Sequence, residues 1–274
     1  MAKCVRCGKR GLFLKLDYNK HCPACALSYK QEREAYIANQ IRLKNENALH
    51  RYHSIPQHQF FYVDEHRKRQ RGFPAIKTIN ITPKGDFSRF VVFDTETTGI
   101  TPSRDRIVEL GAVRFVEGLP VERFCTLVNP ECPIPPEASD VSGIYDSDVF
   151  HAPTISQVLT PFEAFIGSDL LIAHNLEFDL KMLFYSGSVL FNMKRNYLDT
   201  LAQARRLLKN PKSKYDSEGD YWYKDYDFDY DVENYKLETL CDYYGIWQVN
   251  SHRADFDALA TGDLFLSLVS EVQG

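Results

Sequence analysis

The hydrophobic positions from residue 90 onward alternate between short apolar runs and longer amphipathic repeats. Runs at residues 90–93 and 170–173 stop at polar or turn residues, which predicts two buried strands. Apolar residues then recur at helical spacing from residue 176, over 236–246 and from about 254 to 272. A glycine near the end of the second repeat is typical of a helix C-cap. The pattern predicts strands alternating with helices in this part of the chain.

Carboxylates interrupt these predicted elements at three places. Asp94 and Glu96 follow the first strand, Asp179 lies early in the next helix, and Asp257 lies about one turn into the last helix. The two-residue period of a strand places Asp94 and Glu96 on one face. A carboxylate that faces a core is costly unless it is paired or binds a metal. Few nearby lysines or arginines could neutralise these acids, so the pattern favours divalent cations.

Each of these features also has an ordinary explanation when taken alone. Many strands end in aspartate, and an acid near a helix N-terminus is a common partner of the helix dipole. A histidine in a loop, such as His252, is often simply solvated. His252 precedes Asp257 by five positions, however, and this spacing suits a base that accepts a proton from an attacking water. The combination of all three stretches favours catalysis.

Three motifs carry a family resemblance. The stretches DTETTG (94–99), HNLEFD (174–179) and HRADFD (252–257) resemble the exonuclease motifs of the DEDD superfamily in its histidine branch, which includes proofreading exonucleases of bacterial replicases. The resemblance covers about residues 88–272. By this resemblance, IVELGAVRF and ERFCTLVNP are the second and third strands, and YLDTLAQARRLL is a helix behind the sheet. The family often has His-Gly-Ile-Thr where this chain has SGIY (142–145), a departure that we expect to affect local packing only.

The resemblance implies an α/β fold of the ribonuclease-H-like type, with a mixed five-stranded sheet flanked by helices. It also implies two Mg²⁺ or Mn²⁺ ions and hydrolysis from a 3′ end. In the implied mechanism Asp94 bridges both ions, Glu96 and Asp257 support the activating side, Asp179 supports the other, and His252 takes the proton. The resemblance and the local sequence together give a set of substrate-binding candidates: Thr95, Thr98, Gly99, Asn175 and Phe178. For Phe178, a place in the core is an equally good interpretation.

Four cysteines near the N-terminus indicate a second metal site. Cys4 and Cys7 form one CxxC pair, Cys22 and Cys25 form another, and 14 residues separate the pairs. The segment between them is too short to hold a core without a metal, and four thiolates complete tetrahedral zinc. Two disulfides are the alternative, which the lack of a secretory signal disfavours. We therefore predict one structural Zn²⁺ in a module spanning residues 1–26.

Charge is distributed unevenly along the 274 residues, although the net charge is only −4. Residues 1–90 contain 18 lysines and arginines against 7 acids, and the remainder contains 15 against 30. A basic arm joined to an acidic catalytic domain can offset the repulsion of a nucleic acid. Residues 27–85 are predicted to be a helical and basic connector, whose aromatic and basic residues either bind nucleic acid or form a solvated linker.

The exonuclease domain is predicted to span residues 86–274, with an acidic, tyrosine-rich insertion at 209–235. A loop of this length is usually a functional or disordered insertion. Its acidity would repel a nucleic-acid backbone, so we place it outside the substrate groove, and contact with the basic arm is an alternative.

Three functions remain open from the sequence. The first is a 3′-to-5′ exonuclease acting on DNA, with a single-stranded 3′ end as the expected substrate; the second is the same chemistry on RNA. The third is a non-catalytic scaffold, which the intact acids disfavour. The chain ends soon after its last helix, so we expect a free-standing nuclease in replication or repair, with its protein partner undetermined. No apolar run is long enough to span a membrane, and we expect a cytoplasmic protein.

Overall fold

The computed structural model describes residues 72–192, 194–216, 221–226, 229–248 and 252–274, together with positions 2, 3, 10, 11, 24 and 31. The chain divides into two units, Met1–Tyr62 and Val63–Gly274. In the first unit, strand β1 (Ala2–Lys3) pairs antiparallel with β2 (Arg10–Gly11). The predicted zinc ligands Cys4, Cys7, Cys22 and Cys25, and most of the predicted connector, lie outside the described residues.

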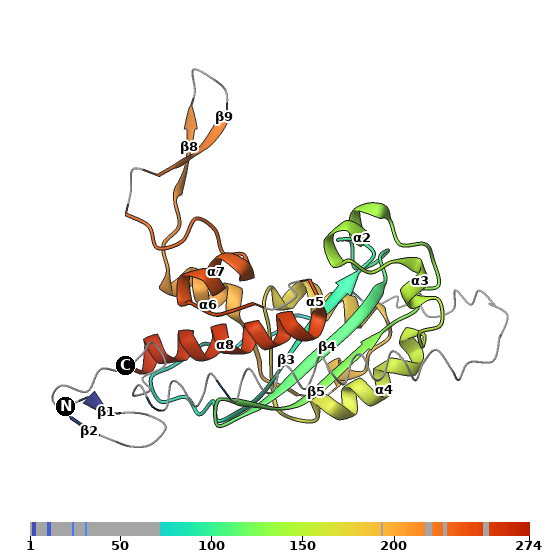
Figure 1. Ribbon diagram of the computed structural model, residues 1–274, viewed down its shortest axis with the longest axis horizontal. Helices are drawn as coiled ribbons and strands as arrows, with labels where there is room; N and C mark the ends of the chain where they lie inside the picture. The colour runs from blue at the N-terminus through green and yellow to red at the C-terminus, as the bar shows by residue number, and fades with distance from the viewer. Residues whose placement is uncertain are drawn as a thin grey trace. The chain divides into compact units, whose positions relative to one another are not determined.

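The second unit is built on a mixed sheet of five strands, in the order β5-β4-β3-β6-β7 (Figure 1). Strand β3 (Arg89–Thr97) pairs antiparallel with β4 (Ile107–Val116), which pairs antiparallel with β5 (Leu119–Leu127). On its other side β3 runs parallel to β6 (Leu170–Ala173). The predicted fold class, an α/β domain with a mixed five-stranded sheet flanked by helices, is confirmed.

The fifth strand corrects one detail of the sequence interpretation. The stretch YLDTLAQARRLL does not form a single helix, because Tyr197–Asp199 is strand β7, parallel to β6, and helix α6 covers only Thr200–Leu207. Tyr197 and Leu198 are buried at the position next to β6, and Asp199 caps α6 by accepting a hydrogen bond from the Leu201 amide (3.0 Å). The pairing with β6 and this cap place the boundary between strand and helix at Asp199.

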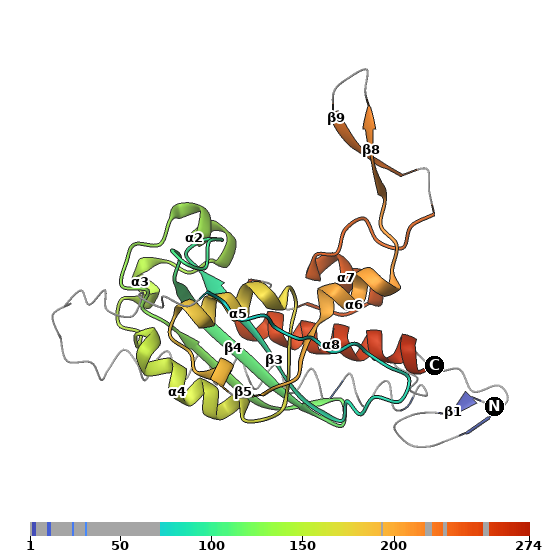
Figure 2. The same ribbon diagram turned by 180° about the vertical axis from the view of Figure 1, so that it is seen from behind.

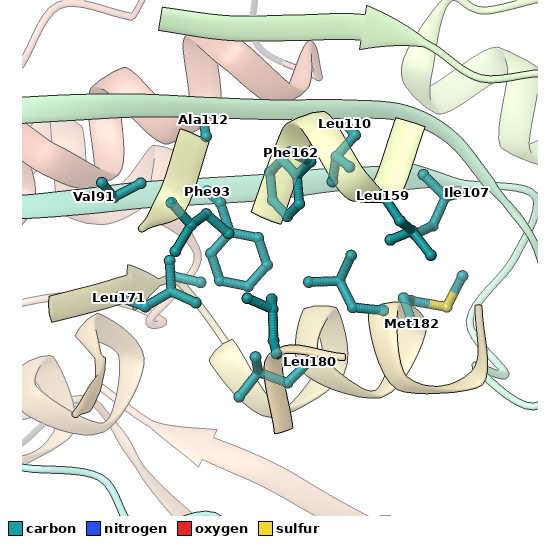
Figure 3. Packing of buried hydrophobic residues seen from close by; sticks show 14 of the residues in the cluster. Val91, Phe93, Ile107, Leu110, Ala112, Leu159, Phe162, Leu171, Leu180 and Met182 are labelled. Atoms are coloured by element: carbon teal, nitrogen blue, oxygen red, sulfur yellow. The ribbon is translucent and has the colours of Figure 1, made fainter. Parts of the chain in front are cut away.

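Helices cover both faces of the sheet (Figures 1 and 2). Helices α4 (Ile155–Ile166) and α5 (Leu176–Tyr185) pack on the face that carries Val91 and Phe93, where Phe162 and Leu180 complete a buried cluster (Figure 3). Helix α8 (Ala254–Gln273) packs on the opposite face, where the ring of Phe265 meets that of Phe90 at a centroid distance of 4.8 Å. The two faces of β3 therefore look toward different helices.

Shorter elements complete this unit. Helices α2 (Pro136–Ser142) and α3 (Asp146–Val149) follow β5, a 3-10 turn (Leu190–Asn192) precedes β7, and α7 (Leu237–Tyr244) contacts α8. The glycine C-cap predicted for α7 is present, because Gly245 adopts a left-handed conformation with φ 65°. In the SGIY stretch, Gly143 caps α2 and Ile144 is buried. Among the described residues, no helix combines the length and the hydrophobicity needed to cross a membrane.

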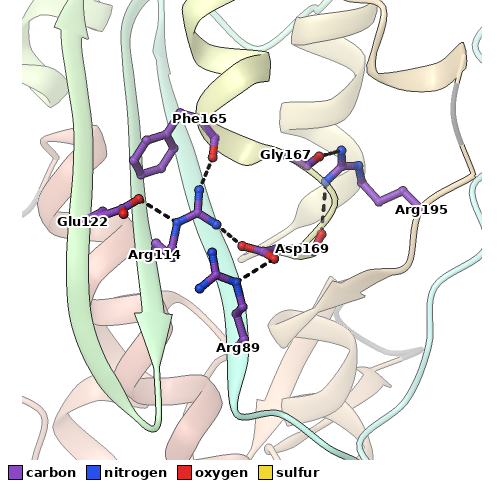
Figure 4. Close-up of polar contacts among 7 residues, drawn as sticks. All are labelled: Arg89, Arg114, Glu122, Phe165, Gly167, Asp169 and Arg195. Atoms are coloured by element: carbon purple, nitrogen blue, oxygen red, sulfur yellow. Dashed lines mark hydrogen bonds and ion pairs between the residues drawn. The ribbon is translucent and has the colours of Figure 1, made fainter.

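A polar network ties the sheet together at the end remote from the predicted acids (Figure 4). Arg114 of β4, which pairs with Val91, binds Glu122 of β5 (2.8 Å) and also binds Asp169 and the carbonyl of Phe165. Arg89 of β3 binds the same Asp169 at 3.0 Å. The network therefore joins three strands to the loop that precedes β6.

The acidic insertion contains regular structure. Strands β8 (Lys212–Asp216) and β9 (Tyr221–Asp225) form an antiparallel hairpin that projects from the helices around α7 in both views (Figures 1 and 2). Trp222 is 70% exposed, and its ring lies 5.2 Å from that of Tyr215 on the neighbouring strand. At the base, the Tyr235 hydroxyl donates to the carbonyl of Leu208 (2.8 Å). That the insertion lies outside the substrate groove, or contacts the basic arm, stays a prediction.

Candidate active site

The end of β3 presents side chains to both faces of the sheet. Asp94 and Glu96 continue the series of Phe90 and Val92 on the α8 face, as the period of two residues requires. Thr95 lies on the opposite face, and its hydroxyl donates a 2.6 Å hydrogen bond to Oδ1 of Asp179 in α5. One strand end therefore approaches an acid on α5 and the start of α8 at the same time.

The four predicted acids come together at this strand end. Carboxylate oxygens of Asp94, Glu96 and Asp257 lie within 4.8 Å of one another. Asp179 is buried. Among the neighbouring carboxylates, it exerts the strongest repulsion on Asp94 and so raises the pKa of Asp94 most. We call Asp94, Glu96, Asp179 and Asp257 the acidic cluster. Its members come from β3, α5 and α8, which are far apart in the sequence.

The acidic cluster is electrostatically unfavourable without a counter-charge. Burial is the main cause of the raised pKa of every member, and repulsion between neighbouring carboxylates adds to it. The pKa of Asp94 lies well above its usual range, that of Glu96 rises to about 8, that of Asp179 to about 7 and that of Asp257 to about 6. Converging oxygen ligands that repel one another in this way fit Mg²⁺ or Mn²⁺.

His252 lies next to this cluster, immediately before α8. Its backbone amide donates to Oδ2 of Asp257 at 2.9 Å, and its side chain is exposed. The residue has φ 65°, in the left-handed region that few non-glycine residues adopt. Because the imidazole is exposed, packing does not fix its orientation. Its orientation therefore depends on the backbone conformation that the neighbouring residues impose.

The predicted substrate-binding residues differ in their surroundings. Besides Thr95, which donates to Asp179, Thr98 is buried and accepts a 2.9 Å hydrogen bond from the Arg106 amide. Gly99 packs against Asp105, and a Cβ at Gly99 would lie 2.6 Å from that carboxylate. Asn175 is exposed and left-handed (φ 66°), whereas Phe178 packs against the core beneath α5. Thr98 and Gly99 therefore have clear roles in shaping the turn after β3, and the packing of Phe178 agrees with its core interpretation.

Sequence reasoning missed two charged residues beside the cluster. Glu109 of β4 lies opposite Glu96 in the sheet and is fully buried. Arg253 follows His252 and donates to both carboxylate oxygens of Glu109. A glutamate inside the otherwise apolar run IVELGAV was the available signal, because a buried charge needs a partner.

His174, which begins the second motif, is occupied by structural contacts. Its Nδ1 lies 2.9 Å from the Thr200 hydroxyl, and its Nε2 lies 2.9 Å from the carbonyl of Tyr235. Burial lowers its pKa, which favours the neutral imidazole, and its Nε2–H then donates to the Tyr235 carbonyl.

Comparison with known proteins shows the family to which the chain belongs. Residues 91–265 match the exonuclease family RNase_T, so the chain belongs to that family. The most similar relatives include the PolC-type DNA polymerases III of Caldanaerobacter subterraneus (34% identity over 185 residues) and Oceanobacillus iheyensis (35% over 185 residues). Each alignment covers 67% of this chain but only 12% of the polymerase, so the chain spans about one eighth of the length of these relatives.

Solved structures support the fold. A crystal structure of E. coli Exonuclease I with a dA16 oligonucleotide superposes with a TM-score of 0.52 at 19% identity, over 68% of this chain and 41% of that one. Another Exonuclease I structure gives a TM-score of 0.51, also at 19% identity, over 66% of this chain and 40% of that one. At this level of identity the likeness concerns the arrangement of strands and helices.

Proposed function

We propose that this chain is a 3′-to-5′ exonuclease of the histidine branch that depends on divalent cations and removes nucleotides from a single-stranded 3′ end of DNA. The acidic cluster carries the proposal, because four carboxylates from three elements meet with raised pKa values. DNA is preferred as substrate because the most similar relatives are DNA polymerases and because Exonuclease I is seen with an oligonucleotide. RNA is the second candidate, since no residue assigned here distinguishes the sugars.

The residues suit this reaction in distinct ways. Asp94, Glu96, Asp179 and Asp257 would hold two Mg²⁺ or Mn²⁺ ions. When bound, the ions would stabilise the negative charge that develops on the scissile phosphate and on the leaving oxygen. Water attacks the phosphorus, His252 accepts its proton, and the bond to the 3′ oxygen breaks to release a nucleoside 5′-monophosphate. One structural Zn²⁺ on Cys4, Cys7, Cys22 and Cys25 remains part of the proposal.

Digestion of matched 5′-labelled DNA and RNA oligonucleotides with Mg²⁺ or Mn²⁺ tests the proposal. A 3′-to-5′ exonuclease shortens the labelled strand in single-nucleotide steps, and the proposal expects this for DNA at a higher rate than for RNA. Release of the labelled 5′ nucleotide first would contradict the direction. Absence of cleavage with either cation would contradict the activity.

The raised pKa values predict how metal and pH together affect stability. Acids with raised pKa bind protons more tightly in the folded chain than in the unfolded chain, where they titrate near pH 4. In EDTA the acids of the cluster should therefore lower the melting temperature as pH rises from about 4, where they titrate in the unfolded chain, to about 8, the pKa of Glu96 in the folded chain. Mn²⁺ replaces these protons, so it should raise the melting temperature more at pH 8 than at pH 5.5.

Thermal melts at both pH values, with and without Mn²⁺, check this prediction. The control is Asp257→Asn, in which the gain from Mn²⁺ at pH 8 should shrink because one ligand is lost. An equal gain at both pH values would show that the cation does not bind where the protons bind.

A further inference from the structure

The start of α8 is fastened to the sheet by one buried carboxylate. Glu109 accepts from Arg253 Nε through Oε2 (3.0 Å) and from a terminal guanidinium nitrogen through Oε1 (2.5 Å). Oε2 also accepts a 3.0 Å hydrogen bond from the amide of Ala254, the first residue of the helix. Such a two-pronged guanidinium–carboxylate pair fixes orientation as well as distance.

The backbone of β4 at Gly111 also packs directly against the start of α8. Gly111 pairs with Asp94 in the sheet, and a Cβ at Gly111 would lie 2.3 Å from the amide nitrogen of Asp255 and 2.4 Å from the carbonyl carbon of Ala254. Only glycine permits this approach. Asp255 also forms an ion pair with Arg123 of β5. Residues 253–255 are therefore held to β4 and β5 directly beside the acidic cluster.

The two residues assigned to catalysis on this segment lie on either side of the attachment. His252 immediately precedes Arg253, and Asp257 lies one turn after it. The backbone amide of His252 and the carboxylate of Asp257 are joined by a 2.9 Å hydrogen bond. A non-glycine residue stays left-handed, as His252 does, only where its surroundings determine its conformation. The bonds between Arg253 and Glu109 supply that constraint on one side.

We propose that Glu109 and Arg253 are positioning residues, which together set the orientation of His252 and Asp257 for hydrolysis. This inference rests on the proposed function. The alternative that Glu109, Cys125 and Asp255 form a further metal site has the required spacing. It is disfavoured because Glu109 is paired with Arg253 and Asp255 with Arg123. The pair acts through its neighbours, and neither residue needs to touch the substrate.

Arg253→Met and Arg253→Lys test the proposal in the full-length protein. A displacement of about 1 Å in a reacting group can cost about a hundredfold in rate. Arg253→Met should therefore lower kcat on an oligonucleotide by roughly tenfold to a hundredfold, with KM changed by less than about threefold. Arg253→Lys keeps the charge but cannot make the bidentate contact with Glu109, so its kcat should lie between those of Arg253→Met and wild type. A rise in KM with kcat unchanged would instead make Arg253 a substrate contact and would overturn the proposal.

A double-mutant cycle asks whether the two residues act as a unit. Glu109→Gln keeps the shape of the side chain and an acceptor for the Ala254 amide but loses the charge. If the two residues act together, kcat of the double variant Glu109→Gln/Arg253→Met should be about the same as that of the slower single variant. Losses that multiply would mean independent roles and would contradict the proposal.

Two further measurements separate positioning from general destabilisation. Arg114→Met removes a buried arginine that has two carboxylate partners, in the network of Figure 4 away from the cluster. It should lower the melting temperature while kcat stays within about twofold of wild type. The gain in melting temperature from Mn²⁺ should fall in Arg253→Met and not in Arg114→Met, because Asp257 is displaced only in the former. Inactivity of the wild-type protein would count against the proposed function, whereas an active wild type matched by Arg253→Met would refute this inference alone.

Discussion

Asp94→Asn is expected to abolish nuclease activity and to raise the melting temperature of the metal-free protein. The pKa of Asp94 lies well above its usual range because the group is buried and because Asp179, Asp257 and Glu96 repel its charge. Asparagine keeps the shape and removes that repulsion. It also removes a proposed metal ligand, and the loss of several kcal/mol of transition-state stabilisation corresponds to a fall in kcat on the order of a thousandfold or more.

Measuring digestion and thermal melting on the same preparation separates these two effects. Asp140→Asn, an exposed change on α2, is the control and should leave both quantities unchanged. Asp257→Asn should also be inactive but should gain less stability, because the Asp257 carboxylate accepts the His252 amide. Activity near wild type in Asp94→Asn would remove the basis of the proposed mechanism. A lower melting temperature without metal would show that the cluster is not under repulsive strain.

Features encoded locally in the sequence could be predicted well. Period-two alternation placed Asp94 and Glu96 on one face of β3, and the glycine after α7 indicated the C-cap found at Gly245. The last helix, expected over about 254–272, runs from Ala254 to Gln273. These features depend on side-chain periodicity and capping, which nearby residues determine.

Features that depend on distant partners could not be predicted in this way. Glu109 and Arg253 are 144 positions apart, and only the packing of α8 on β4 shows that they meet. The three-residue strand at Tyr197–Asp199 is defined by its pairing with β6, and the interpretation by family resemblance had merged it with the helix that follows. The hairpin β8–β9 was not predicted either, because we interpreted residues 209–235 as a long loop, although their aromatic residues are a recognised strand signal.

His252→Ala is expected to reduce turnover strongly, on the order of a hundredfold, with little change in affinity for the oligonucleotide. The reason is that the imidazole of His252, a residue whose backbone amide donates to Asp257, is the proposed acceptor of the proton from the attacking water. Steady-state kinetics at saturating Mn²⁺, with binding measured separately in Ca²⁺, check both statements.

The backbone of His252 requires a matched control, because φ 65° strains an alanine at this position. His252→Asn removes the imidazole with a residue that tolerates the left-handed region, and His252→Gln keeps a polar side chain of similar length. Neither amide accepts a proton usefully at neutral pH, so both variants should be as slow as His252→Ala. If His252→Asn kept wild-type turnover, the conformation at residue 252 and not its imidazole would matter. If all three variants weakened binding and left kcat unchanged, His252 would be a substrate contact, and the proposed proton transfer would be wrong.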